Sequence, residues 1–212
     1  MLSALRCPLA YALKHKEPNG IFHHFLPIVL ISCYNILMDK ILLEFWYDTP
    51  LGRMLSLSDD EALYLLEFEH RKFLDREIER LKKRLSAKIE YGETIISKQL
   101  ARELDGYFQG KLQVFTVPFE LVGTEFQKLV WQAVLQIPSG ERWTYKAIAE
   151  KINKPQASFA VGAANGANQL ALIVPCHRLV RTDGELAGYA GGLDKKRWLL
   201  NHESEFKNER KV

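Results

Sequence analysis

The chain has 212 residues, 47% of them hydrophobic and 26% charged, and its formal net charge is +3. This balance is typical of a globular protein and excludes a disordered or fibrous chain. The small net charge does not by itself indicate a nucleic-acid binder, but residues 141–212 hold 12 Lys and Arg against 8 Asp and Glu. That local excess favours a polyanionic partner for the C-terminal part, although ordinary surface scatter explains such a difference equally well.

The three cysteines, Cys7, Cys33 and Cys176, are odd in number and widely spaced, and no C-x-x-C pair occurs. This pattern indicates neither a disulfide framework nor a zinc ribbon. We therefore expect a free thiol, no bound metal and a reducing compartment, the cytoplasm.

The first 37 residues differ in character from the rest. Ile21–Leu37 is apolar, but it contains histidines and Pro27 and is shorter than a membrane-spanning helix requires. Basic residues precede it, as in a signal peptide, yet the small-residue cleavage site is missing. We expect residues 1–37 to be an extension upstream of a true start at Met38, and we expect no membrane association.

Residues 38–120 are predicted to form an N-terminal α/β domain that begins with three short strands. Ile41–Tyr47, Arg53–Ser58 and Ala62–Phe68 are apolar runs separated by turn residues. Short strands joined by tight turns predict an antiparallel meander.

Two helices and one further strand are predicted to complete this domain. Lys72–Leu85 and Thr94–Gln109 carry apolar residues at helical spacing, and Gly110 is placed to end the second helix. Val114–Phe119 is predicted as a strand, with Pro118 placing its end at a sheet edge.

A second, mostly helical domain is predicted over residues 121–205, with Thr124 and Thr144 as helix N-caps. The predicted elements are helices at 124–136, 144–152 and 156–166, an apolar strand at 170–174, and a final helix at 195–203 before a charged tail at 206–212.

The helices at 144–152 and 156–166 have the proportions of a helix-turn-helix. The second helix has almost no long polar side chain that could read base edges in the major groove. A helix with small residues on its outer surface instead suits close approach to the minor groove. The alternative is a helix packed tightly inside the protein.

Cys176 and His177 follow the apolar strand and a proline. A free thiol with a pKa of about 8.5 is mostly protonated at neutral pH, and the thiolate is the nucleophile, so a nearby base matters. If the backbone is extended there, the two side chains point to opposite faces, and coupling them requires a bridging water or a bend. The pair also fits a buried structural cysteine beside an exposed histidine.

The string around this pair, Ile173-Val174-Pro175-Cys176-His177-Arg178-Leu179-Val180, closely resembles the active-site motif of the O6-alkylguanine-DNA alkyltransferases. The flanking segments that fit in order and spacing are Ala160-Val161-Gly162, Gly166-Ala167-Asn168, Gly188-Tyr189, Gly191-Gly192-Leu193 and Trp198-Leu199-Leu200-Asn201-His202-Glu203. The resemblance covers about residues 40–205 and is strongest from Gly123 onward. It implies an α/β fold with a small antiparallel, ribonuclease H-like N-terminal domain and a winged-helix-like C-terminal domain.

The resemblance implies a monomer that repairs double-stranded DNA containing alkylated guanine. The base would be flipped out of the duplex, and its O6-alkyl group would move irreversibly to Cys176, once per molecule and without a cofactor. O4-alkylthymine is left open as a second substrate. The implied catalytic roles are acceptor thiol for Cys176, base through a water for His177, orientation of the imidazole for Glu203, guanine protonation and nucleotide rotation for Tyr145, and the active-site turn for Asn168.

The resemblance also implies two sets of binding residues. The base pocket would be lined by the Val174 and Cys176 carbonyls, the Tyr189 ring and the Ala190 amide. The implied DNA contacts are Thr144, Ser158, Phe159, Ala160, Gly162, Ala163 and Arg178.

Phe159 departs from the family pattern, which usually has an arginine just before the Ala-Val-Gly run. An aromatic wedge can fill an unstacked step, but it cannot donate hydrogen bonds to the orphaned cytosine. This puts the efficiency of base flipping in doubt. Alternatively, Phe159 is only a core residue of its helix.

Three other functions fit less well. An alkyltransferase-like protein that only binds O6-alkylguanine lacks the acceptor cysteine, whereas Cys176 is present. A transcription regulator calls for base-reading side chains or a second module. A cysteine hydrolase usually brings its cysteine and histidine together from distant segments.

Overall fold

The computed structural model describes residues 40–209. The predicted extension at 1–37, with Cys7 and Cys33, lies outside the described residues, as do residues 210–212. No helix in the described part is long and apolar enough to cross a membrane.

A four-stranded sheet forms the first part of the fold. The predicted meander is confirmed: β1 (Lys40–Tyr47), β2 (Met54–Ser58) and β3 (Leu63–Phe68) pair antiparallel. A fourth strand, β4 (Ala87–Tyr91), pairs parallel to β1 and gives the order β3-β2-β1-β4. The sequence did not predict β4 because it is a short edge strand, interrupted by two charged residues, that follows the preceding helix after a single residue.

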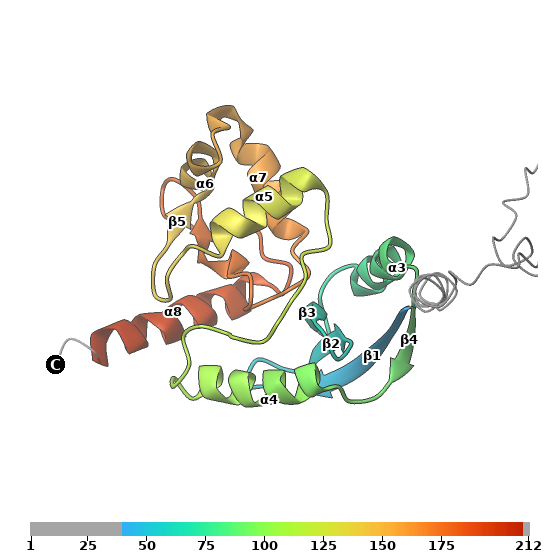
Figure 1. Cartoon of the computed structure of the whole chain (residues 1–212). Helices are drawn as coiled ribbons and strands as arrows, with labels where there is room; N and C mark the ends of the chain where they lie inside the picture. The colour runs from blue at the N-terminus through green and yellow to red at the C-terminus, as the bar shows by residue number, and fades with distance from the viewer. Residues whose placement is uncertain (1–39, 210–212) are drawn as a thin grey trace, which may run out of the picture. The chain divides into compact units, whose positions relative to one another are not determined.

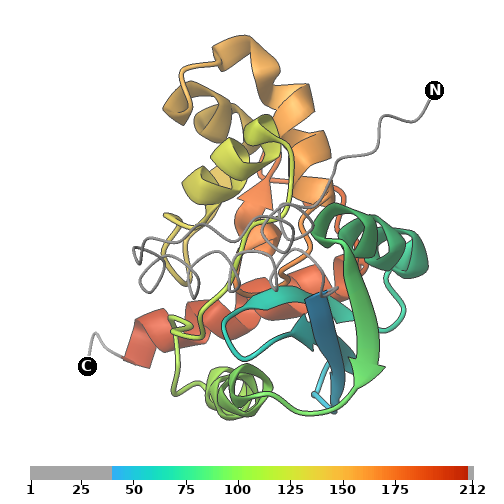
Figure 2. The same cartoon turned by 45° about the vertical axis from the view of Figure 1, so that its right-hand side comes forward.

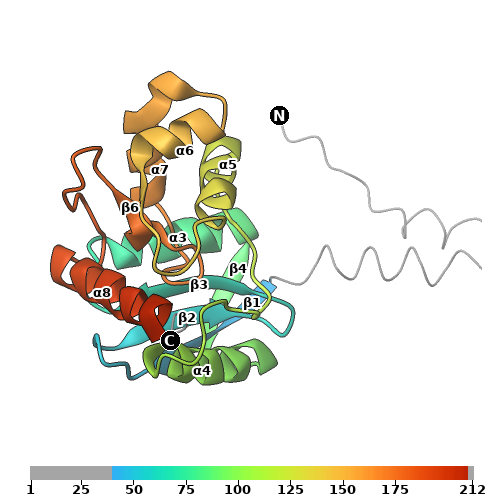
Figure 3. The same cartoon turned by 90° about the vertical axis from the view of Figure 1, so that its left-hand side faces the viewer.

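Two helices cover the two faces of this sheet (Figures 1 and 3). The α3 helix (Leu74–Leu85) packs with one set of buried strand residues, including Leu55 and Leu65. The α4 helix (Ile95–Phe108) lies against the other face, and Figure 2 shows it below the sheet. As predicted, α4 begins after Thr94 and ends before Gly110, which adopts a φ of 79°.

The second part of the fold is mostly helical. Its elements are α5 (Glu125–Val134), β5 (Trp143–Thr144), α6 (Tyr145–Lys151), a 3-10 turn (Pro155–Ala157), α7 (Ser158–Gly166), a second 3-10 turn (Cys176–Arg178), β6 (Leu179–Val180) and α8 (Leu193–Glu209). The helix-turn-helix is confirmed as α6, the first turn and α7. Figure 1 shows α5, α6 and α7 grouped together, with α8 running below this group. The final helix is longer than predicted and continues into the expected tail.

The edge strand β3 connects the two parts of the fold. Leu66 forms a parallel bridge with Leu170, and Leu63 forms one with Phe119. Two strand predictions were wrong here, because Val114–Phe119 and Leu170–Val174 each contribute only one isolated bridge. The second segment turns instead, with Leu172 at a φ of 68°. One apolar core runs from the sheet into α5, α7 and α8, and a second lies between the sheet and α3.

Candidate active site

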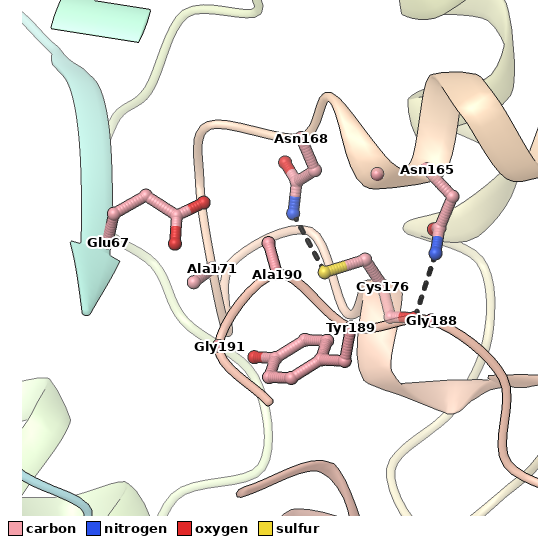
Figure 4. A pocket seen from close by; sticks show the side chains of 10 residues that line it. Glu67, Asn165, Asn168, Ala171, Cys176, Gly188, Tyr189, Ala190 and Gly191 are labelled. Atoms are coloured by element: carbon pink, nitrogen blue, oxygen red, sulfur yellow. Dashed lines mark hydrogen bonds between the residues drawn. The ribbon is translucent and has the colours of Figure 1, made fainter. Parts of the chain in front are cut away.

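The turn that carries Cys176 is built around Asn168. The Asn168 side chain accepts a hydrogen bond from the Leu170 amide at 3.0 Å and donates to the Val174 carbonyl at 3.0 Å. The same Nδ2 lies 3.1 Å from the Cys176 Sγ, and Asn165 Nδ2 donates to the Cys176 carbonyl at 3.2 Å (Figure 4). The end of α7 therefore fixes both the backbone and the sulfur of Cys176.

His177 belongs to a separate, fully buried network. Its Nε2 lies 2.9 Å from Glu203 Oε1, and neither side chain is exposed. Glu203 also accepts hydrogen bonds from Arg178 Nε and Nη2, both at 2.8 Å, and from the Tyr107 hydroxyl at 2.9 Å. His177 Nδ1 is buried and has no hydrogen-bond partner among the described residues.

Of the two possibilities left open by the sequence, an extended backbone or a bend, the structure shows a bend: Cys176 and His177 lie in a 3-10 turn. The two side chains still have different partners, since Cys176 contacts Asn168 whereas His177 contacts Glu203. The alternative of an exposed histidine beside a structural cysteine is wrong, because His177 has no exposed surface.

Burial dominates the electrostatics of these groups. It raises the pKa of the Cys176 thiol to about 11; the Asn168 hydrogen bond opposes this shift, and the charge on Glu67 adds to it. Burial also lowers the pKa of His177, with Glu203 opposing. Although burial alone would raise the pKa of Glu203, His177 and Arg178 hold it well below its usual range. Glu203 is therefore a carboxylate beside a neutral imidazole, and Cys176 is a thiol, at neutral pH.

Cys176 opens onto a small pocket that the glycine-rich loop closes (Figure 4). Tyr189 and Ala190 line it together with Gly188 and Gly191. A Cβ on Gly191 would come within 2.9 Å of the Tyr189 ring and 3.0 Å of the Phe68 ring, so the loop requires glycine there. The free space is about 10 Å³, room for roughly one water molecule.

Two side chains hold the loop at the Ala187 carbonyl. The Tyr145 hydroxyl donates to this oxygen at 3.3 Å, and Lys196 Nζ donates to it at 2.7 Å. Lys196 is fully buried and also donates to the Leu179 carbonyl at 2.5 Å. Burial raises the pKa of Tyr145, so its hydroxyl keeps its proton at neutral pH.

The outer face of α7 is open to solvent. Phe159 is 92% exposed, and Ala160 and Ala163 are exposed beside it, whereas Val161 and Ala164 are buried. The alternatives of a helix packed inside the protein and of Phe159 as a core residue are therefore wrong.

The α7 helix lies close to Tyr145. A Cβ added at Gly162 would lie 3.9 Å from the Tyr145 ring, so this part of the helix is next to the site. Thr144 accepts a hydrogen bond from the Ala147 amide at 3.0 Å and caps α6, and Ser158 begins α7.

Two predicted site residues need correction. Arg178 was predicted to contact DNA, but its guanidinium is buried against Glu203 and also donates to the Ile137 carbonyl. Val174 was predicted to line the base pocket, but it is fully buried and does not line it. Its carbonyl already accepts hydrogen bonds from Asn168 Nδ2 and the Cys176 amide, which uses both lone pairs.

Sequence reasoning missed four polar residues around the site: Glu67, Arg71, Asn165 and Lys196. Glu67 could have been found, because a carboxylate inside an otherwise apolar strand is unusual and calls for a partner. Lys196 lies in a basic run, which usually forms a solvated surface. The described residues contain no group of three or more His, Cys, Asp or Glu side chains that could hold a metal ion.

Comparisons with known proteins found matches that together span most of the described residues. The family model described as the ribonuclease-like domain of 6-O-methylguanine DNA methyltransferase matches residues 42–121, and the model of its DNA binding domain matches 125–205. The methylated-DNA–protein-cysteine methyltransferase of Methanosarcina barkeri is 42% identical over 157 residues, which cover 74% of this chain and 93% of that protein. The enzyme of the same name from Mycobacterium leprae is 52% identical over 101 residues, which cover 48% and 61%.

Among solved structures, Mycobacterium tuberculosis OGT in complex with DNA superposes with a TM-score of 0.66. It is 35% identical, and the match covers 78% of this chain and 94% of that one. The resemblance found in the sequence and the predicted fold class are thus confirmed. The chain belongs to the methylated-DNA–protein-cysteine methyltransferases, DNA-repair enzymes whose methyl acceptor is a cysteine of the protein itself.

Proposed function

We propose that Cys176 is the acceptor, and that it takes the alkyl group from O6 of guanine in duplex DNA. The observation that carries this proposal is the position of the Cys176 sulfur, which is held by Asn168 at the wall of a pocket, while the next residue in the chain, His177, is buried against Glu203. The product is a thioether that water does not hydrolyse, so each molecule acts once. The reaction needs no cofactor or metal.

Because the pKa of Cys176 is raised to about 11, the thiol needs a base at neutral pH. We propose that a water on the unpartnered His177 Nδ1 passes the thiol proton to the imidazole, and that Glu203 stabilises the imidazolium that forms. The Cys176 thiolate then attacks the alkyl carbon, and the bond from that carbon to O6 breaks. The departing guanine takes a proton from the Tyr145 hydroxyl.

The O6 atom lies inside the duplex, so the base has to be flipped out before the sulfur can reach the alkyl carbon. The exposed small-residue face of α7 supports a position in the minor groove, with Ser158, Ala160, Gly162 and Ala163 close to the backbone. A free space of about 10 Å³ is far too small for a purine, so the loop at 188–192 has to open when the base enters.

Further parts of the proposal rest on the sequence. We propose that the protein acts as a monomer and in the cytoplasm, since a free acceptor thiol requires a reducing compartment. The domain division at 38–120 and 121–205 follows from the change in element order. O4-alkylthymine is proposed as a second substrate.

The proposal is tested by intact mass after incubation with a duplex that contains O6-methylguanine. We expect the protein to gain the mass of one methyl group, and peptide mapping to place it on Cys176. The unmodified duplex is the matched control. A methyl group found only on Cys7 or Cys33, or no gain at all, would contradict the proposal.

Phe159 offers a test of base flipping. An aromatic side chain can restore stacking worth about 1–3 kcal/mol per base. It cannot make the hydrogen bonds of an arginine, each worth about 1.5–3 kcal/mol when a charged group is involved. We expect Phe159→Arg to speed repair of duplex DNA several-fold and Phe159→Ala to slow it. Neither change should alter the rate with free O6-benzylguanine, which needs no flipping.

The measurement is the second-order rate constant of each variant on both substrates. Because Phe159 is 92% exposed, neither substitution disturbs the core, and thermal stability serves as the control. Duplex repair by Phe159→Ala at the parental rate would show that Phe159 is not a wedge.

A further inference from the structure

A buried carboxyl group lines the Cys176 pocket on the side of the sheet. Glu67 lies on β3, is only 3% exposed, and points toward the pocket from the side of Ala171 (Figure 4). The other five residues of β3 are apolar or aromatic. A charge at such a position is costly unless a partner compensates it.

That partner is Arg71, whose Nε lies 3.1 Å from Glu67 Oε1. Arg71 is itself buried, and its Nη2 donates to the carbonyls of Gly166 and Asn168 at 3.1 and 3.0 Å. The guanidinium is therefore fixed by the turn behind Cys176 and cannot follow a ligand into the pocket. Glu67 remains the only carboxyl group on the described pocket wall.

The Tyr189 hydroxyl is a second polar group of this pocket without an assigned task. It is buried and has no hydrogen-bond partner among the described residues. Transfer of a methyl group requires neither a carboxyl nor a free hydroxyl beside the thiol. These groups instead suit a pocket that responds to the polarity of what enters it.

We propose that Glu67 makes the pocket selective by charge, so that neutral alkyl groups are transferred to Cys176 and alkyl groups bearing a carboxylate are disfavoured. This inference rests on the proposed function, in which the Cys176 thiolate displaces a leaving group from the alkyl carbon. Two negative charges confined in a weakly polarisable pocket repel each other much more strongly than in water.

The selectivity depends on pH because Glu67 titrates. Burial raises the pKa of Glu67 to about 8, with Arg71 opposing, so the carboxyl gains its charge as the pH rises from 7 to 9.5. The charged and titratable groups that face Glu67 or the pocket are Arg71, Glu77 of α3, Tyr107 of α4, Cys176, Tyr189 and Lys196 of α8. Burial lowers the pKa of Lys196 to about 8, so the loss of its charge over the same range has to be separated from the effect of Glu67.

Two alkylating probes of nearly equal shape separate charge from reactivity. Iodoacetamide is neutral and iodoacetate is anionic, and in both cases the Cys176 thiolate displaces iodide from a CH₂ carbon. Because both reagents react with the same thiolate, the ratio of their rates does not depend on the fraction of Cys176 that is ionised. The same ratio measured with glutathione corrects for the difference in intrinsic reactivity between the two reagents. The full chain carries Cys7→Ser and Cys33→Ser, so that Cys176 is its only thiol.

With Glu67 present, we expect the ratio of neutral to anionic rates to rise about tenfold between pH 7 and 9.5. Glu67→Gln should make the ratio nearly independent of pH. Glu69→Gln is the matched control, because this carboxyl is one-third exposed and pairs with Arg53 outside the pocket. A slope that persists in Glu67→Gln would assign the effect to Lys196 and overturn the proposal, as would a flat ratio in the parent.

A second variant covers the case in which Glu67→Gln does not fold. Glu67→Leu with Arg71→Gln removes both charges and keeps an amide donor at position 71 for the carbonyls of Gly166 and Asn168. It should also give a flat ratio. On DNA at pH 9, the quantity to compare is the ratio of the methyl transfer rate to the carboxymethyl transfer rate from O6 of guanine. This ratio should be about tenfold higher for the parent than for Glu67→Gln. Failure of the parent to transfer methyl would contradict the proposed function, whereas the probe ratio would still decide the role of Glu67.

Discussion

Replacing Cys176 with alanine is expected to abolish methyl transfer while binding to DNA that contains O6-methylguanine persists. The sulfur is the atom that forms the new bond, and its hydrogen-bond partner among the described residues is Asn168 Nδ2. Removing it leaves the exposed face of α7 unchanged, so the DNA contacts should survive. Cys176→Ser should be equally inactive, because a serine hydroxyl is a far weaker nucleophile than a thiolate.

Transfer is measured with a duplex labelled on the O6-methyl group, and binding by fluorescence anisotropy. Cys7→Ser with Cys33→Ser is the matched control, since it removes the other two thiols and should keep the parental rate. A labelled Cys176→Ala protein formed at the parental rate would refute the assignment of the acceptor.

Local signals predicted much of the fold. The apolar runs of β1, β2 and β3 and the threonine caps of α5 and α6 lie where the sequence indicated, because each depends on a few neighbouring residues. Elements that depend on distant partners were missed or misread. Leu170 pairs only with Leu66 of the sheet edge, about a hundred positions earlier, and the residues after it turn around Asn168 rather than extending.

The site shows the same division between local and distant information. The motif around Cys176 identified the nucleophile, the histidine and Glu203 through the family resemblance. Arg178 was misassigned because an arginine in a DNA-binding protein is ordinarily a surface cation, and its burial depends on a carboxylate 25 positions away. Glu67 reaches the pocket only because β3 joins the turn after α7, a contact that no local pattern encodes.

Glu203→Gln is expected to destabilise the protein and to slow transfer strongly, because Glu203 is the centre of the buried network. Its two oxygens accept hydrogen bonds from His177, Arg178, Tyr107 and the Gly140 amide. The substitution leaves the buried Arg178 guanidinium without a countercharge, and breaking a buried pair in this way typically costs about 3–5 kcal/mol. Urea unfolding at pH 7 measures this loss.

The pH dependence of stability follows from the lowered pKa of Glu203. A carboxyl whose pKa is lower in the folded state stabilises the fold fully above its unfolded value, about 4.3, and loses that contribution as the pH falls toward the folded value. Glu203 also supports protonation of His177, so the difference in unfolding free energy between the parent and Glu203→Gln should hold or widen from pH 7 to 5 and shrink only below about pH 4. If the difference shrank already between pH 7 and 6, the pH dependence would belong to a group other than Glu203.

The rate profile separates a positioning role from simple loss of stability. With His177 as the base, the parental rate with free O6-benzylguanine should level off above about pH 7, where the imidazole is neutral. Without the Glu203 charge, the imidazolium is no longer stabilised, and only thiol molecules that have already ionised can react. Because the pKa of Cys176 is about 11, the variant's rate should climb about tenfold per pH unit from 7 to 9. The rates are measured at a temperature where all variants are folded. Parallel pH profiles for the parent and Glu203→Gln would show that Glu203 only supports the fold. A profile that climbs in Glu203→Gln and returns to a plateau in Glu203→Asp would tie the charge of the carboxylate to proton transfer from Cys176.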